Sequence, residues 1–212
     1  MKLRLSYPTK PWIITQKFGE KKVCVKIESP GVPLGARKLR EKTGSMCPIG
    51  YEDLYEKLGM NGHNGTDASA PRWWPVYAPL DGQVIELVAE LERGLGIGIL
   101  SHEKLDFGDP YGTHYAKVRL WHFQKLNVTK DQWVKRGSLV GWCGDSGIAT
   151  SPHVHDELKP VDFKPNAEMY NTVQDNGFYG AIDPESYRDN ETPPPSIVGS
   201  FFGFLKQKTT WT

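Results

Sequence analysis

Glycine and proline interrupt this chain so often that long helices have little room to form. Its 212 residues include 22 glycines and 16 prolines, and aromatic residues make up 11%. Glycine and proline disfavour the interior of a helix, and with many aromatic residues they are typical of short strands joined by turns. The stretch 131–147 shows the pattern, because four of its residues are glycines. The composition therefore predicts a mainly β protein, and the length suits one domain with a hydrophobic core.

Alternation of apolar and polar residues predicts where the strands lie. The strand-like segments are 11–19, 22–29, 95–99 and 113–123. Asp81–Gly82 stands between two apolar runs, which is the signal of a hairpin turn. The segment 51–58 differs, because its apolar residues recur at the spacing i, i+3, i+4 and i+7. This spacing predicts one short helix over 51–58, closed by Gly59.

His153 and His155 occur two residues apart in the stretch SPHVHDEL (151–158). On a β-strand the side chains of residues i and i+2 point to the same face, so both imidazoles would enter the same space. That arrangement suits a metal ion, or a metal ion with a general base beside it. Two surface histidines on an edge strand are the alternative, because so short a pattern recurs by chance.

A second motif offers further metal donors. His63 opens the segment HNGTD, and Asp67 follows it four residues later. Asparagine, glycine and proline around this segment disfavour a helix and favour an extended or turning chain. With His155, His63 and Asp67 would form three ligands and leave a fourth position for water, which is the arrangement of a catalytic zinc site. The sequence contains no CxxC pair, which argues against a zinc site built from thiolates.

The bulk properties exclude several classes of function. The formal net charge is +1 and charged residues make up 24%, which gives no basis for binding nucleic acid or a polyanion. No run of 18 apolar residues exists, so the sequence predicts no membrane span. The start, MKLRLSYPTKPW, lacks the continuous apolar stretch of a secretory signal. Either export follows another route, or the sequence begins after processing.

The three cysteines, Cys24, Cys47 and Cys143, cannot all pair within one chain. A disulfide between Cys24 and Cys47 is conceivable but is not favoured. Cys143 could be a nucleophile near His153. Its setting, GWCGDSG, is more typical of a tight turn with a small buried side chain.

We expect residues 1–190 to form one domain with an insertion at about 20–62. Within the insertion, the loop 30–50 is rich in glycine and proline and is basic. It predicts either a wall of a binding groove or a passive surface insertion.

The region 191–212 begins with a proline-rich connector, which is stiff and extended, and ends in an apolar tail. The tail is too short to span a bilayer. It could pack on the body, touch a membrane surface or bind a partner.

Several ordered motifs of this chain resemble those of the lysostaphin-type (LytM-like) zinc metalloendopeptidases, which hydrolyse peptidoglycan. The likeness runs from ITQKFG to AIDPESY, most of the chain. In order, the motifs are His63-x-Gly65-x-Asp67, LDGQV (80–84), His102 after a strand, Trp121–His122, VKRGSLVGWCG (134–144) and His153-Val154-His155 with Glu157 just after. Each motif alone is weak, but an ordered set of this kind is specific.

The resemblance implies an antiparallel β-sheet core with a substrate groove and few short helices. It implies that His63, Asp67 and His155 bind Zn²⁺, and that His153 and His122 are the catalytic pair. In this scheme His153 takes a proton from the attacking water as general base, and His122 donates a hydrogen bond to the oxyanion. Glu157 is a candidate acceptor for the second N–H of a ligand histidine, if the strand geometry permits. The implied activity is hydrolysis of peptide bonds in peptidoglycan stem peptides or cross-bridges.

The chain departs from the family pattern in the long segment between Gly19 and His63, at Ser151, which replaces a frequent glycine, and at Asp156. Asp156 stands where the family usually has an aromatic or aliphatic side chain. Strand alternation turns Asp156 away from His155 and into what is normally core. An unpaired buried carboxylate is costly, so Asp156 must find a partner or lie at an edge. Of the other histidines, His102 is expected to be a hydrogen-bonded structural residue and His114 a surface one.

Two other functions stay open from the sequence. A wall-binding or regulatory module of the same fold, without activity, would have lost ligands, whereas all three ligands and both catalytic histidines are present here. A structural part of a phage particle or secretion apparatus could keep the hydrolase for local penetration of the wall. In each case peptidoglycan is the expected partner and the bacterial cell wall the site of action, outside the cell or in the periplasm. We expect the protein to be a monomer.

Overall fold

The computed structural model describes residues 1–21, 24–26, 38–39, 51–91, 93–174 and 176–189. The strands are β1 (Ile13–Gln16), β2 (Cys24–Lys26), β3 (Lys38–Leu39), β4 (Tyr51–Asp53), β5 (Thr66–Ser69), β6 (Pro75–Tyr77), β7 (Gly82–Glu90), β8 (Gly94–Asp106), β9 (Thr113–Trp121), β10 (Phe123–Leu126), β11 (Trp133–Val134), β12 (Leu139–Cys143), β13 (His153–Phe163) and β14 (Met169–Asn171). Helical turns are α1 (Leu54–Lys57) and the 3₁₀ helix η2 (Pro184–Tyr187). The predicted mainly β, antiparallel fold is confirmed. Within these ranges, no helix has the length and apolar character that crossing a membrane requires.

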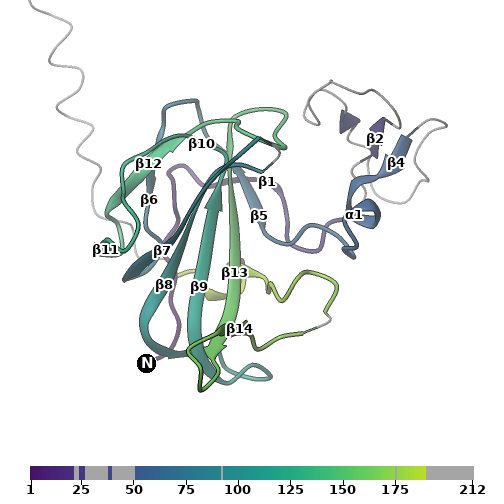
Figure 1. Ribbon diagram of the computed structural model, residues 1–212. Helices are drawn as coiled ribbons and strands as arrows, with labels where there is room; N and C mark the ends of the chain where they lie inside the picture. The colour runs from purple at the N-terminus through teal and green to yellow at the C-terminus, as the bar shows by residue number, and fades with distance from the viewer. Residues whose placement is uncertain (22–23, 27–37, 40–50, 92, 175, 190–212) are drawn as a thin grey trace, which may run out of the picture.

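A central antiparallel sheet of eight strands organises the molecule (Figure 1). Its strand order is β1-β5-β13-β9-β8-β7-β11, and β14 pairs with the far end of β13. The chain bends at Asp81 between β6 and β7, but these strands belong to different sheets, so the hairpin predicted at Asp81–Gly82 is not formed. Strand β13 lies between β5 and β9, so its side chains can meet residues from both neighbours.

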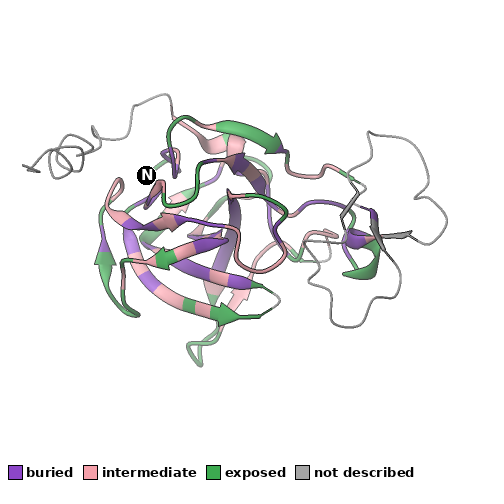
Figure 2. Cartoon of the chain, turned by 90° about the horizontal axis from the view of Figure 1, so that it is seen from above, coloured by how far each residue is buried: buried purple, intermediate pink, exposed green. Residues whose placement is uncertain are grey.

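The hydrophobic core lies between the central sheet and a smaller sheet of order β10-β12-β6. Ile99, Leu120 and Leu158 face it from the central sheet, and Val76 and Phe123 face it from the smaller one. Figure 2 colours each residue by its burial. The first residues of β7 alternate between buried and half-buried, as expected when one face of a sheet is covered by core, whereas β13 is buried from His153 to Val161. Each apolar side chain of the core contributes about 1.5–3 kcal/mol on burial.

The predicted helix over 51–58 is only partly correct. Residues Tyr51–Asp53 form β4, which pairs with β2 in a third sheet of order β3-β2-β4 (Figure 1). The helix therefore starts at Leu54, three residues later than predicted, and the Asp53 side chain caps it by accepting a hydrogen bond from the Tyr55 N–H at 2.9 Å. Gly59 ends it as predicted, with φ +68, a conformation that suits glycine. Pairing with β2 thus overrides the helical periodicity of the first three residues.

The insertion and the tail are described only in part. The strand predicted over 22–29 is seen as β2, while most of the loop 30–50 and the whole region 191–212 lie outside the described residues. Cys24 is buried and disulfide-bonded, although the sequence did not favour such a bond; Cys47 lies outside the described residues. Cys143 is free, and its side chain is buried as predicted, although it ends strand β12 and does not lie in a tight turn.

Candidate metal centre

Asp67 and His155 meet because their strands are paired in register. In the ladder between β5 and β13, His155 is directly opposite Asp67 and His153 is opposite Ser69. Side chains of directly opposite residues share one face of the sheet at about 5 Å between their Cβ atoms. Asp67 Oδ1 lies 2.9 Å from His155 Nδ1. Strand register alone therefore brings together two predicted ligands that are far apart in the sequence.

His63 reaches the same point from the turn that precedes β5. Its backbone is held by hydrogen bonds from the Gly19 N–H to its carbonyl (2.8 Å) and from its own N–H to the Glu20 carbonyl (3.0 Å). Its Nε2 lies 2.9 Å from His155 Nδ1 and 3.2 Å from Asp67 Oδ1. The intervening Gly65 is packed so closely that a Cβ there would lie 2.7 Å from His155 Nε2. This close approach explains why glycine occupies the middle of the His63–Asp67 motif.

The three side chains fit a zinc ion. One donor atom from each of His63, Asp67 and His155 can be chosen so that all lie within 4.8 Å of one another. The observed separations of 2.9–3.2 Å are close to the roughly 3.4 Å that separates ligands of a tetrahedral zinc with bonds of 2.0–2.1 Å. His63 Nδ1 lies 3.2 Å from the Lys17 carbonyl, so it carries the proton and leaves Nε2 as the donor atom. Such a backbone acceptor commonly orients a zinc ligand.

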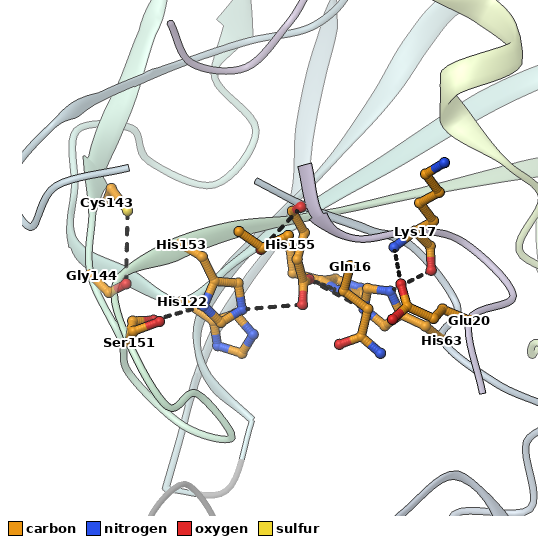
Figure 3. Close-up of polar contacts among 12 residues, drawn as sticks. Gln16, Lys17, Glu20, His63, His122, Cys143, Gly144, Ser151, His153 and His155 are labelled. Atoms are coloured by element: carbon orange, nitrogen blue, oxygen red, sulfur yellow. Dashed lines mark hydrogen bonds and ion pairs between the residues drawn. The ribbon is translucent and has the colours of Figure 1, made fainter. Parts of the chain in front are cut away.

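His153 and His122 lie beside this triad (Figure 3). His153 is on the same face of β13 as His155. His122 follows the last residue of β9 and has φ +68, a left-handed conformation that turns the chain out of the central sheet and into β10. The two rings are 4.5 Å apart between centroids, and His153 Nε2 is 3.6 Å from Asp67 Oδ2. The structure thus brings together all five site residues that the sequence singled out.

The tautomers of the two outer histidines follow from their partners. His153 Nδ1 lies 2.7 Å from the Ser151 carbonyl, and His122 Nδ1 lies 2.7 Å from the Ser146 carbonyl. A carbonyl oxygen can only accept, so Nδ1 carries the proton in each ring. In the neutral form, each ring therefore has its lone pair on Nε2. Both rings can accept a proton at Nε2, and neither can donate one there until it is protonated.

The ionisation of the site follows from burial and from the charge of Asp67. Burial alone would raise the pKa of Asp67, but the charge of His63 and hydrogen bonds from His155 and His63 lower it well below the usual value. Burial would lower the pKa of His155, but its hydrogen bond to Asp67 and the Asp67 charge raise it. Burial, then repulsion from His153 and His155, lowers the pKa of His122 to about 3. Asp67 is therefore ionised at neutral pH and His122 is uncharged.

Glu157 does not serve as the acceptor for a ligand histidine. Its carboxylate lies 2.6 Å from Lys159 Nζ and 4.0 Å from Arg119 Nη1. Arg119 in turn donates to Glu86, which also accepts from Lys117 at 2.5 Å. The Glu86 side chain passes over Gly98 of β8 to reach β9. A Cβ added at Gly98 would lie only 2.7 Å from Glu86 Oε2. This ionic network was not predicted from the sequence, although charged residues stand at alternate positions of 117–119 and 157–159.

The roles expected of the remaining histidines are wrong and are in fact reversed. His102 is exposed, and its ring lies 5.2 Å from that of Trp133. His114 is half-buried, and its Nδ1 lies 2.9 Å from Asp162 Oδ2. The register of β8 against β9 shifts between Leu100 and Lys104, so alternation counted from the sequence does not hold there.

Cys143 is not placed to act as a nucleophile. Burial, with the nearby charge of Asp145, raises the pKa of its thiol to about 12. Its Sγ lies 3.6 Å from the Ala70 carbonyl, as a weak donor would. The thiolate is the nucleophilic form of cysteine, and this site suppresses it.

Comparison with known proteins matches the chain to characterised peptidases. The profile of Peptidase family M23 matches residues 61–167, which include all five site residues. Peptidoglycan DD-endopeptidase ShyA of Vibrio cholerae is 34% identical over 116 residues, or 52% of this chain and 24% of ShyA. Glycyl-glycine endopeptidase ALE-1 of Staphylococcus capitis is 32% identical over 114 residues, or 51% of this chain and 28% of ALE-1. The chain thus matches about a quarter of the length of these relatives.

One solved structure supports the fold across nearly the whole chain. The structure of Helicobacter pylori Csd3 aligns with 90% of this chain and 36% of its own, with a TM-score of 0.51 and 16% sequence identity. At this identity, the likeness concerns the fold alone.

Proposed function

Because the chain belongs to peptidase family M23, we propose that it is a zinc-dependent endopeptidase that hydrolyses peptide bonds in the stem peptides or cross-bridges of peptidoglycan. The observation that carries the proposal is the convergence of His63 Nε2, Asp67 Oδ1 and His155 Nδ1 on one point. The relatives ShyA and ALE-1 are endopeptidases by name, and the name of ShyA specifies peptidoglycan. Their shared family makes the bacterial cell wall the proposed site of action.

His63, Asp67 and His155 would hold the zinc ion. When bound, zinc would polarise the scissile carbonyl and lower the pKa of the attacking water toward ~7. The negative charge of Asp67 and the two imidazole lone pairs supply a donor set of the kind found in catalytic zinc sites. Three protein ligands leave room for substrate and water, unlike the closed sets of structural zinc sites.

His153 is assigned as the general base. The Ser151 carbonyl holds its Nδ1–H, which leaves the Nε2 lone pair on the side of the ring that faces Asp67. A ring in this state can take a proton from the attacking water and later return it to the leaving amine. Such a base typically contributes about 10²–10⁴-fold to the rate.

His122 is assigned a different role from the one expected from the sequence. Its Nδ1–H is bound to the Ser146 carbonyl and its pKa is lowered to about 3, first by burial. A neutral His122 with its lone pair on Nε2 accepts a hydrogen bond and so helps to orient the water. It can donate to the oxyanion only after it has taken up a proton. The substrate groove, the monomeric state and an association with phage stay predictions.

Digestion of purified cell walls tests the proposal. The zinc-loaded protein would be incubated with walls of several chemotypes, with and without glycine cross-bridges, and the released fragments identified by mass spectrometry. We expect fragments with new peptide termini at one type of bond, and none from the His153→Ala variant or the chelated protein. Binding to walls without any released fragment would instead favour the inactive wall-binding module.

A further inference from the structure

A pocket of about 1110 Å³ lies at the edge of the central sheet that is remote from the metal centre. Its walls come from the start of β7, the middle of β8, strand β11, the first residues of the chain and Asp189. In the sheet order, β11 is four strands from β13, or roughly 19 Å at about 4.8 Å per strand. The pocket is therefore separate from the five site residues. We call it the Trp133 pocket.

An exposed aromatic platform forms one wall of the Trp133 pocket. The Trp133 side chain is 57% exposed, and the ring of His102 lies 5.2 Å from it at an angle of 59°. An indole has a broad apolar face and a single polar N–H, so it suits a ligand that is apolar on one face and polar at its rim. Such a residue at the edge of a pocket marks a binding surface more often than an isolated apolar residue does.

Asp189, which lines the same pocket, has a buried carboxylate oxygen that needs a donor. The Asp189 side chain is only 10% exposed; its Oδ2 accepts from Arg136 Nη1 at 2.6 Å, but within the described chain its Oδ1 has no hydrogen-bond partner. A buried polar atom without a partner costs free energy, and a ligand hydroxyl or amide N–H would remove that cost. Arg136 cannot be rearranged freely to supply the bond, because it already anchors Oδ2.

The charges of the pocket favour a neutral ligand that is rich in polar groups. Four basic and three acidic side chains line it, so their formal charges nearly cancel. A polyanion would meet the acidic groups, and an apolar ligand would leave both kinds without partners. A ligand that carries donors and acceptors around an apolar face satisfies the Trp133 ring, the Asp189 oxygen and the lysines together.

We propose that the Trp133 pocket binds a saccharide, namely an N-acetylated amino-sugar segment of a glycan chain. The apolar C–H face of a pyranose ring would stack on Trp133, and a hydroxyl or acetamido N–H would donate to Asp189 Oδ1. Lys135 and Lys2 would donate to sugar oxygens at the rim. The choice of an amino sugar rests on the proposed function, because the peptides of peptidoglycan are attached to such a glycan. The pocket would hold the glycan while the metal centre acts on peptide some distance away.

Titration with the soluble probe tri-N-acetylchitotriose tests the inference on the full, zinc-loaded chain. The chain has seven tryptophans, so the indole N–H signals in an NMR spectrum report on each, and Trp133→Phe identifies the signal of Trp133. We expect that signal to shift on titration. Trp133→Ala should weaken binding about tenfold or more, as loss of a central aromatic contact commonly does. Trp133→Phe, which keeps a ring, should weaken it less.

Trp73→Ala is the matched control, because Trp73 is 54% exposed and does not line the pocket. It should bind the probe as the parent does. The inference is overturned if the parent fails to bind at millimolar probe, or if Trp133→Ala binds as well as the parent. His155→Ala should also bind the probe normally. Loss of probe binding with intact wall hydrolysis overturns only the pocket, whereas full hydrolysis by His155→Ala overturns only the proposed function.

Discussion

Two carboxylates on neighbouring strands, Asp67 on β5 and Asp156 on β13, lie on opposite faces of the central sheet and meet opposite surroundings. Asp67 is 13% exposed and has three histidines around it, with His155 Nδ1 at 2.9 Å. Asp156 is fully buried and forms an ion pair with Arg188. A guanidinium stays charged at any accessible pH, whereas an imidazole can lose its proton and offer a lone pair. The first carboxylate can therefore share a cation with its neighbours, and the second can only be structural.

The surroundings of Arg188 support the structural role of Asp156. Arg188 also donates to the Ser6 carbonyl at 2.8 Å and lies 3.1 Å from Glu185 Oε1. Its guanidinium lies 5.4 Å and 5.0 Å from the ring centroids of Tyr7 and Trp12. One buried cation thus ties the first residues of the chain to β13 and to η2. The contrast teaches that the role of a buried carboxylate depends on whether its partners can lose a proton. Burial alone does not separate Asp67 from Asp156, because both are largely buried.

The largest expected effect is the loss of turnover when one of the two histidines beside the triad, His153 or His122, is replaced. His153→Ala and His122→Ala should each lower wall hydrolysis by about 10²–10⁴-fold, because the first removes the general base and the second removes the hydrogen-bond acceptor that orients the reacting water. Both should keep a full equivalent of zinc, since neither residue belongs to the triad. Hydrolysis rates and elemental analysis would be measured on the same samples. Near-parental turnover of His153→Ala would remove it from the mechanism, and loss of zinc would make it a ligand.

Asp156→Ala should act on stability instead. Removing one partner of a buried ion pair leaves Arg188 without its main counter-charge, which typically costs about 3–5 kcal/mol in the free energy of unfolding. Zinc content should be unchanged in the folded fraction. Urea unfolding would measure the loss. The matched control is Asp162→Ala, also on β13, whose partners Lys104 and His114 are 46% and 24% exposed; its loss should be smaller. Equal losses in the two variants would contradict a buried structural pair.

Glu86→Gln should give a smaller, pH-dependent effect. Burial would raise the pKa of Glu86, but hydrogen bonds from Arg119 and Lys117 lower it below 4.5. A lowered pKa stabilises the fold above the usual glutamate value, and this stabilisation disappears as the pH falls through the lowered pKa. At pH 7 we expect the variant to be about 1 kcal/mol less stable, because the pair is partly exposed. Urea titrations between pH 7 and 3 should show the difference shrinking; a difference that grows on acidification would refute the assignment.

Cys143→Ala should have the smallest effect on activity. The thiol is buried and its pKa is raised to about 12, so it is protonated at working pH. Hydrolysis by the variant should stay within about twofold of the parent, since cysteine here is a small packing residue. Iodoacetamide should leave the native thiol unmodified. A large loss of activity without loss of folding would return Cys143 to the list of catalytic candidates.

The site could be predicted from the sequence because its geometry is largely local. Alternation along β13 fixes the shared face of His153 and His155, and the HNGTD motif fixes His63 relative to Asp67. The residue types of the two motifs suggested a shared set of three ligands, and the resemblance to a family supported it. Pairing between β5 and β13 spans about 90 residues of sequence and leaves no local signal. The requirement that Asp156 find a partner was also predictable, from the cost of a buried charge, and it is confirmed.

The features that the sequence did not predict depend on contacts between distant elements. Nothing near Asp156 indicated that its partner would be Arg188, 32 residues later. His102 lies at the register shift between β8 and β9 and is exposed, and His114 pairs with Asp162 of β13, a contact between residues 48 apart in the sequence. Similarly, the first three residues of the predicted helix form β4, because their backbone groups pair with β2. Secondary-structure propensity and the periodicity of apolar residues describe one segment at a time. Backbone pairing between distant segments can override both.

Zinc content, measured by elemental analysis, tests the central claim most directly: that His63, Asp67 and His155 form a zinc site. The parent should carry one zinc per chain, with nitrogen and oxygen ligands at roughly 2.0–2.2 Å by X-ray absorption. His155→Ala, folded to the same extent by circular dichroism, should carry no stoichiometric zinc. A full equivalent of zinc in that variant would contradict the assignment.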